Sequence, residues 1–113
     1  GELGIVETPA GEVRALVPPD ADAVEVVLRA DAVTLHEPAD APAGGATSAR
    51  NRFSGTVVDV ERGESICRVS IDVGADAPLS ALVTEESRER LALEPGREVV
   101  ASFKATATRT TPR

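Results

Sequence analysis

The sequence predicts an all-β fold: an OB-like Greek-key β-barrel with one short helix, preceded by additional short strands. Three observations lead to this prediction. Short apolar runs of alternating polarity recur along the chain, clusters of glycine and proline separate them, and one short helical segment precedes the last run. The chain has no strand–helix–strand alternation, so a parallel sheet is not expected.

Length and composition favour one small domain with an aliphatic core. The 113 residues include two phenylalanines and no Trp, Tyr or Met, so valine, alanine, leucine and isoleucine must fill the interior. The absence of Met favours a fragment of a longer chain. No apolar run approaches the roughly 18 residues of a membrane span, and no signal peptide is visible, so we expect a cytoplasmic location.

The first part of the chain, residues 1–40, is expected to contribute additional short strands that pack on the barrel. The turn residues Pro9-Ala10-Gly11 separate the first two candidates. The apolar runs lie at residues 4–6, 13–17, 24–29 and 32–35. Residues 41–47 are rich in proline, glycine and alanine and have no periodicity, so we interpret them as a linker.

The second part, residues 48–108, is expected to form the barrel, and residues 109–113 a tail. Its strand candidates are residues 53–60, 67–73, 79–83 and 98–104. In the second of these, Cys67, Val69, Ile71 and Val73 alternate with polar residues, which is typical of a strand with one buried face. Cys67 is therefore expected to be a buried, inert thiol.

A short helix is predicted at residues 85–91, between the last two strands. Thr84 can cap it, because a threonine oxygen can accept a hydrogen bond from an unpaired amide of the first turn. Two glutamates then lie at the positive end of the helix dipole and two arginines at the negative end, which suits that dipole.

Signatures of catalysis are missing from the sequence, so we do not expect an enzyme. The phosphate-binding motif Gly-x-x-x-x-Gly-Lys-Ser/Thr is absent. His36 and Cys67 are the single members of their types, which gives no metal cluster and no nucleophile–base pair. We interpret His36 as a surface residue. The net charge of −7 argues against nucleic acid as a partner, because phosphate binding requires clustered cations.

Two polar segments, 48–51 and 104–106, form a candidate binding site. The first is Ser48, Ala49, Arg50 and Asn51, and the second is Lys104, Ala105 and Thr106. Lys104 is the single lysine of the chain. Hydroxyls, backbone amides and a cation together can hold a small oxyanion. The alternative is a strand start with solvent-facing polar residues, and the chemistry alone favours this alternative.

The ordered motifs of residues 48–108 resemble the molybdate-binding Mop (molbindin) and TOBE domains. The resemblance begins at Ser48-Ala49-Arg50-Asn51. It continues through Gly55-Thr56-Val57, Leu79-Ser80-Ala81-Leu82-Val83-Thr84, Leu93-Glu94-Pro95-Gly96 and Phe103-Lys104-Ala105-Thr106. In addition, residues 28–35 are similar to a Leu-Arg-Pro-Glu-x-Val stretch in the C-terminal regions of ABC importer ATPases, although Ala30 and Asp31 replace the expected Pro and Glu.

The resemblance implies a regulatory domain that binds molybdate or tungstate as an oxyanion and needs no cofactor or metal. The implied ligand residues are Ser48, Ala49, Arg50, Asn51, Lys104, Ala105 and Thr106. Because one barrel repeat is present, a complete site would need a second chain, and we expect a homodimer. The implied larger partners are the parent ABC ATPase domain and a membrane permease, which would place the protein at the inner face of the plasma membrane.

Two other functions remain open at this point. The first is a purely structural TOBE dimerisation module without a ligand, since such domains need not keep the motifs at residues 48–51 and 104–106. The second is the effector domain of a molybdate-responsive transcription regulator. The residues do not choose among molybdate, tungstate and sulfate.

Overall fold

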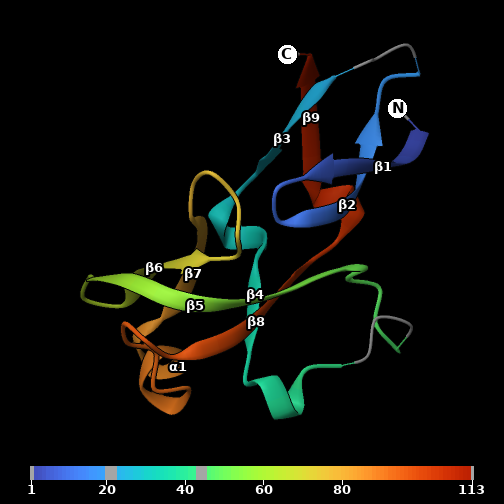
Figure 1. Ribbon diagram of the computed structural model, residues 1–113. Helices are drawn as coiled ribbons and strands as arrows, with labels where there is room; N and C mark the ends of the chain where they lie inside the picture. The colour runs from blue at the N-terminus through green and yellow to red at the C-terminus, as the bar shows by residue number, and fades with distance from the viewer. Residues whose placement is uncertain (1, 20–22, 43–45, 113) are drawn as a thin grey trace.

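The computed structural model describes residues 2–19, 23–42 and 46–112, and within these it contains nine strands and one α-helix (Figure 1). The elements in chain order are β1 (Glu2–Thr8), β2 (Gly11–Val17), β3 (Val24–Leu28), η1 (Ala30–Ala32), β4 (Thr34–His36), η2 (Pro38–Asp40), β5 (Asn51–Arg62), β6 (Ile66–Asp72), β7 (Leu79–Thr84), α1 (Glu85–Arg90), β8 (Glu98–Phe103), η4 (Ala105–Ala107) and β9 (Thr108–Pro112). Those labelled η are single 3₁₀ turns. The all-β prediction with one short helix is therefore confirmed.

The main sheet has five strands in the order β4-β8-β5-β6-β7, and the pairs are antiparallel. Strands β5, β6 and β7 follow one another as hairpins, and β8 then returns to lie beside β5. Three consecutive strands with the fourth beside the first form a Greek key, as predicted. Together with β4, contributed by the first part of the chain, this is the five-stranded OB-like arrangement.

Strand β5 is long enough to pair with two neighbours because it bends. Residues Asn51–Thr56 pair with β8, and Thr56–Arg62 pair with β6. The register shifts between Val57 and Asp59, which is the signature of a β-bulge. The turn before β8 stabilises this bend through two backbone hydrogen bonds: Val57 N donates to Arg97 O at 2.9 Å, and Gly96 N donates to Val57 O at 2.8 Å.

The barrel differs from the prediction in that its sheet is not closed by hydrogen bonds within the described residues. Strands β4 and β7 are the two edges of the sheet. Between them the turn η1 packs against β7. The turn η1 covers the edge at β7. It cannot extend the hydrogen-bond ladder of the sheet, because the backbone groups of a 3₁₀ turn do not follow the repeat of a strand.

The alternating pattern of β6 is confirmed as a core face. Cys67, Val69 and Ile71 are all 0% exposed, whereas Arg68 and Asp72 are exposed. Val73 lies beyond the end of β6 and is half-buried. The main core also contains Val33, Leu35, Val57, Ala81, Leu93, Val99 and Ala101. The interior is thus aliphatic, as the composition requires.

The remaining strands form a second, smaller layer above the main sheet in Figure 1. Strand β1 pairs with β2, and β3 pairs with β9. A small core of Val13, Ala15 and Phe103 joins this layer to the end of β8. The rings of Phe53 and Phe103 stack there, with centroids 6.0 Å apart and planes inclined by 18°.

The C-terminal end differs from the predicted tail. Residues 109–112 lie in β9, which pairs along its length with β3 from the first part of the chain. Alternation is weak in Thr-Arg-Thr-Thr-Pro, so a strand could be recognised only from its distant partner. Part of the predicted linker, residues 43–45, lies outside the described residues. None of the helices that the structure describes is long and apolar enough to cross a membrane.

Candidate functional site

The two candidate segments lie side by side, because β5 and β8 are neighbours in the sheet. Asn51, at the start of β5, is the register partner of Phe103, at the end of β8. The chain continues outward from this pair in both directions. Ser48 and Lys104 consequently reach the same hollow of the surface. Residues more than fifty positions apart in sequence are thus brought together by one antiparallel pairing.

This depression, which we call the β8 hollow, combines polar side chains that can donate hydrogen bonds with apolar ones. Its polar lining side chains are Thr34, His36, Thr47, Ser48, Ser102 and Lys104. Ala32, Ala49, Phe103 and Ala107 supply the rest of the lining. Among the residues that the structure describes, no carboxylate lines the hollow. A surface built in this way favours an anion over a cation.

The turn after β8 holds two further candidate residues, Ala105 and Thr106, which follow Lys104 but do not line the hollow. Lys104 precedes the turn η4, and the first hydrogen bond of that turn runs from Ala107 N to Lys104 O at 3.0 Å. The amides of Ala105 and Thr106 come before this bond, so the turn itself gives them no acceptor. The amide of Ala49 is already used, because it donates to Thr47 Oγ1 at 3.1 Å.

Asn51 has a structural task that the sequence motif did not reveal. Its side chain is 2% exposed and pairs with the backbone of Arg14 in β2. Asn51 Oδ1 accepts from Arg14 N, and Nδ2 donates to Arg14 O, both at 2.7 Å. The side-chain amide of Asn51 therefore forms the pair of hydrogen bonds that the backbone of a neighbouring strand would form, and it holds β2 of the smaller layer against the start of β5.

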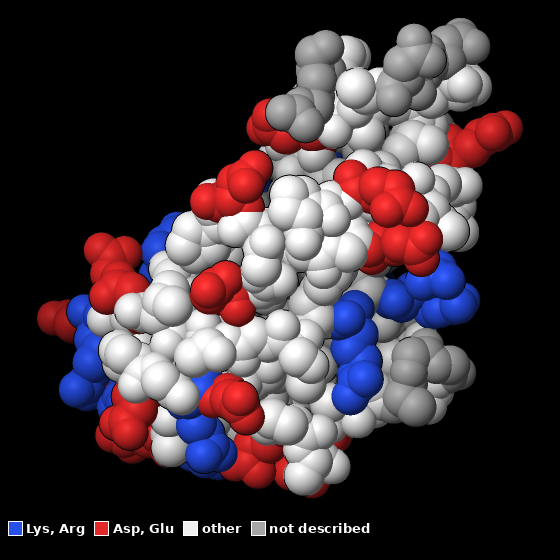
Figure 2. Space-filling model, viewed as in Figure 1, with Lys and Arg blue, Asp and Glu red and all other residues white. Residues whose placement is uncertain are grey.

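Of three exposed cations in the candidate segments and in β5, Lys104 alone lines the hollow, and all three lack carboxylate partners in the described parts of the chain. Arg50, Arg52 and Lys104 are exposed, and none of them forms an ion pair there. In Figure 2 basic side chains gather on the right, beside the segment drawn in grey, with acidic side chains above them. Within the described lining of the hollow, Lys104 is thus a cation without a facing carboxylate, on a chain whose net charge is −7.

His36 is not the simple surface residue that the sequence suggested. It is half-buried in β4, and its Nε2 lies 2.8 Å from Ser102 Oγ. Ser102 is 6% exposed. No local sequence pattern predicts this pair. The two residues meet only because β4 pairs with β8, some sixty residues away in the sequence.

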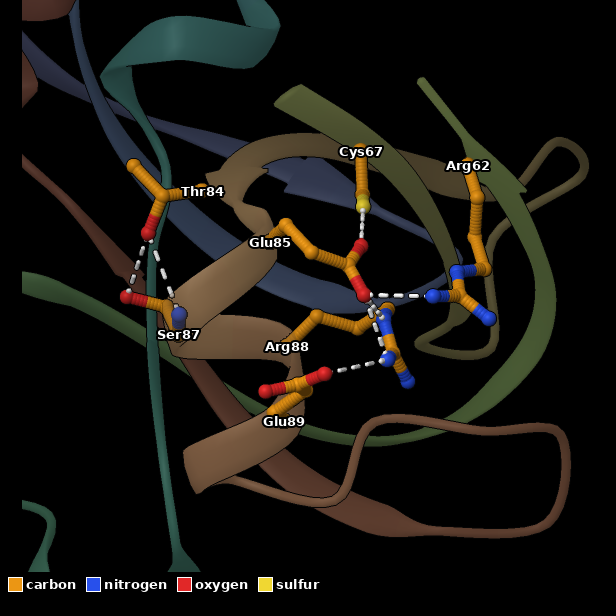
Figure 3. A network of polar contacts seen from close by, with 7 residues as sticks. All are labelled: Arg62, Cys67, Thr84, Glu85, Ser87, Arg88 and Glu89. Atoms are coloured by element: carbon orange, nitrogen blue, oxygen red, sulfur yellow. Dashed lines mark hydrogen bonds and ion pairs between the residues drawn. The ribbon is translucent and has the colours of Figure 1, made fainter. Parts of the chain in front are cut away.

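A second polar cluster surrounds Glu85 at the start of α1 (Figure 3). Glu85 Oε1 lies 2.6 Å from Arg62 Nη2 and 2.6 Å from Arg88 Nη2. The buried thiol of Cys67 donates to Glu85 Oε2 at 2.8 Å. Thr84 Oγ1 accepts from Ser87 N at 3.1 Å, which confirms the predicted cap.

The contacts of this second cluster shift the pKa values of its members. Hydrogen bonds from Arg88, and then from Cys67, lower the pKa of Glu85 to about 2. The hydrogen bond to the Glu85 carboxylate, together with burial, raises the pKa of the Cys67 thiol. Cys67 therefore stays protonated and unreactive, and the carboxylate is saturated by its own neighbours.

The second part of the chain is similar to proteins of a known family. The TOBE domain family matches residues 47–109, which is more than half of the sequence. A "Probable molybdenum-pterin-binding protein" of Haemophilus influenzae is 42% identical over 60 residues, which are 53% of this chain and 87% of that protein.

Two other similar proteins extend the comparison. The "Molybdate/tungstate import ATP-binding protein WtpC" of Pyrococcus abyssi is 39% identical over 61 residues, 54% of this chain and 17% of that protein. The crystal structure of a protein described as the cytoplasmic molybdate-binding protein ModG, with molybdate bound, superposes with a TM-score of 0.71 at 28% identity. That superposition covers 80% of this chain and 62% of ModG.

Proposed function

The chain belongs to the TOBE domain family, and on this premise we propose that it binds molybdate or tungstate as an oxyanion. The observation that carries the proposal is the pairing of β5 with β8, which brings Ser48 and Lys104 into one hollow without a carboxylate among its described lining residues. The names of similar proteins, which include molybdenum, molybdate and tungstate, support this choice of ligand.

The candidate residues divide into ligands and supports. In the hollow, Lys104 supplies a charge-assisted hydrogen bond and Ser48 a neutral one. The amides of Ala105 and Thr106, in the turn that follows Lys104, are proposed to supply further neutral ones, although these two residues do not line the hollow of the single chain. Arg50 adds a second exposed cation. Ala49 contributes a small side chain in the wall of the hollow.

Asn51 is proposed to act indirectly, since both polar atoms of its side chain are bonded to Arg14. By fixing the start of β5 it fixes the position from which Ser48 and Arg50 extend. This assignment changes the expectation from sequence, in which Asn51 was one of the ligands.

The acidic net charge does not prevent anion binding at this place. Carboxylates more than about 10 Å from the bound anion are largely screened from it at roughly 0.1 M salt. The groups within that distance decide the local potential, and the polar groups of the described lining are the Lys104 ammonium, the His36 imidazole and hydroxyls. Binding should therefore weaken with added salt, because the attraction to Lys104 and Arg50 is exposed to solvent.

A second copy of the chain is proposed to complete the site, which gives a homodimer. The hollow is open to solvent on its outer side, with Ser48 and Lys104 both exposed. A tetrahedral dianion that touches one chain alone would keep much of its hydration. We further propose a larger setting: a cytoplasmic regulatory domain of an ABC importer ATPase subunit, with the ATPase domain and a permease as partners. The printed name of WtpC, a molybdate/tungstate import ATP-binding protein, is in keeping with this setting.

Calorimetry with sodium molybdate, sodium tungstate and sodium sulfate tests the function. We expect heat of binding for molybdate or tungstate, and a strong loss of affinity in Lys104→Ala and Arg50→Ala. Arg68→Ala is the matched control, because Arg68 is an exposed arginine on β6 outside the hollow. No heat and no thermal shift with any of the three anions would reject the proposal.

The competing functions give different results. A purely structural dimerisation module would form a dimer, measured by sedimentation, with no response to the anions. The effector domain of a transcription regulator would bind the anion equally well, so the sequence that precedes residue 1 separates it: a DNA-binding domain there, rather than an ATPase, would replace the importer assignment.

A further inference from the structure

Within the β8 hollow lies a histidine–serine pair that the sequence motifs do not include. His36 lies on β4 and Ser102 on β8, and the distance from Nε2 to Oγ is 2.8 Å. Both side chains line the hollow that also contains Ser48 and Lys104. Ser102 is 6% exposed, so its hydroxyl depends on protein neighbours, or on a molecule in the hollow, for its hydrogen bonds.

Ser102 occupies the middle of a row that crosses three strands. Its register partner in β4 is Thr34, and its register partner in β5 is Arg52. Directly opposite residues of antiparallel strands direct their side chains to the same face of the sheet. Ser102 therefore lies between Thr34 and Arg52 on one face of the sheet, with the imidazole of His36 in hydrogen-bond contact.

The direction of the His36–Ser102 hydrogen bond depends on the tautomer and on the protonation of the imidazole. When Nε2 carries no proton, Ser102 O–H donates to it, and only the lone pairs of Oγ remain for other contacts. When the imidazole is protonated, or when its neutral form carries the proton on Nε2, Nε2–H donates to Ser102 Oγ instead. In both cases the serine proton is free to donate to a molecule in the hollow, but only the imidazolium adds a positive charge.

We propose that the His36–Ser102 pair couples proton uptake to oxyanion binding in the β8 hollow, so that the anion binds more tightly at lower pH. This inference rests on the proposed function. Neither residue belongs to the motifs of residues 48–51 and 104–106, so the pair would be an added feature of this chain. Histidine is the side chain whose charge ordinarily changes between about pH 5 and pH 8, which makes the coupling measurable.

The described groups around His36 leave the added charge available to an anion. Arg52 and Lys104 are the cations that line the surface hollows containing His36. Glu37, the next residue, is engaged with Arg97 at 3.1 Å, and Asp40 is exposed on η2. The other described side chains that face the imidazole do not titrate: Ala41, Pro42, Thr47, Ala49, Val100 and Ser102.

Calorimetric titration with sodium tungstate at about pH 6 and about pH 8 tests the coupling. We expect the wild type to bind about fivefold to tenfold more tightly at the lower pH, as one added charge near the anion can provide. His36→Gln should bind at both pH values with one affinity, close to that of the wild type at about pH 8. Ser102→Ala should reduce the pH dependence, and Arg68→Ala should keep it.

A second measurement reads the imidazole itself. His36 is the single histidine of the chain, so its ring resonances can be followed by NMR without overlap. Saturating tungstate should move the midpoint of its titration to higher pH, whereas an equal concentration of chloride should not. This readout needs no variant, and it remains valid if a substitution impairs folding.

The outcomes separate the inference from the function on which it rests. Tungstate binding with one affinity at both pH values, or an unchanged pH dependence in His36→Gln, overturns the coupling and leaves the proposed function in place. No binding of tungstate, molybdate or sulfate by the wild type at either pH rejects both.

Discussion

Two polar clusters lie on the same OB-like unit, one around Glu85 and one around Lys104. They differ in whether their charged groups have partners of opposite charge within the described chain. Around Glu85, one carboxylate contacts Arg62, Arg88 and the thiol of Cys67. Around Lys104, one cation, an imidazole and several hydroxyls line a hollow whose described lining contains no carboxylate. A cluster that satisfies its own charges can only stabilise the fold, whereas a cluster of unmatched donors retains capacity for a ligand.

The clusters also differ in how the chain assembles them. Glu85 and Arg88 are neighbours on one helix turn, so part of the first cluster is encoded locally. Ser48 and Lys104 meet only because β5 pairs with β8, and His36 joins them only because β4 pairs with β8. If this distinction is correct, substitutions in the two clusters should change different properties of the protein.

The largest expected effect is on ligand affinity at the hollow. Lys104→Gln should weaken tungstate binding about 10- to 100-fold, since a hydrogen bond to a charged partner contributes about 1.5–3 kcal/mol. Its unfolding midpoint in urea should match the wild type, because Lys104 is exposed and has no carboxylate partner in the described chain. Calorimetry and urea denaturation measure the two quantities separately.

The contrast requires the opposite result at the other cluster. Arg62→Gln removes an exposed arginine that contacts Glu85, so tungstate affinity should not change. Equal losses of affinity in Lys104→Gln and Arg62→Gln would show that the two clusters are not independent, and the distinction between them would fail.

The second effect concerns Asn51, which belongs to the motif but supports the fold. Asn51→Ala leaves the N–H and C=O of Arg14 without their partners, and we expect a loss of about 2 kcal/mol in unfolding free energy. Tungstate affinity should fall less than in Lys104→Gln. The control is Ser54→Ala, an exposed position on the same strand.

Urea denaturation and calorimetry again decide between the two roles of Asn51. An affinity loss as large as that of Lys104→Gln, with unchanged stability, would make Asn51 a direct ligand and would contradict its role as a support for β2.

Local patterns in the sequence predicted much of the fold. The alternation of Cys67, Val69 and Ile71 identified the buried face of β6, and the residues that follow Thr84 identified α1. Both signals lie within a few positions of the element that they describe. The Greek-key order followed from the number of strands and the position of the helix.

Features that depend on distant pairings were not predictable in the same way. Residues 109–113 were expected to form a tail. Those of β9 show no clear alternation, and the partner strand β3 lies in the first part of the chain. The bond between Asn51 and Arg14 and the contact between His36 and Ser102 span 37 and 66 positions. The motif therefore located the site, but the neighbours that complete it come from the first part of the chain.

The third effect is the response of the Glu85 cluster to acid. The pKa of Glu85 is lowered to about 2 in the folded chain, below its ordinary value near 4.5. The folded state therefore binds fewer protons there than the unfolded state. The resulting stability is fully present above about pH 4.5 and is lost as the pH falls toward 2.

Glu85→Gln should remove this contribution. We expect the variant to be less stable than the wild type at neutral pH, and the difference should shrink as the pH falls below about 4.5. Thermal unfolding at a series of pH values measures it, with Glu86→Gln as the control, since Glu86 is exposed and neighbours Glu85. A difference that stays constant down to about pH 2 would contradict the assignment of the shift to Glu85.

The smallest effect comes from the helix cap that presents Glu85 to its partners. Thr84→Ala removes the acceptor of the Ser87 amide and should lower the unfolding free energy by about 1 kcal/mol. Thr111→Ala is the matched control, because Thr111 is an exposed strand residue with no side-chain hydrogen bond in the described chain. Because Thr84 lies outside the hollow lining, tungstate affinity should stay within about twofold of the wild type. A larger loss of affinity would show that the helix cluster and the hollow are coupled through the sheet.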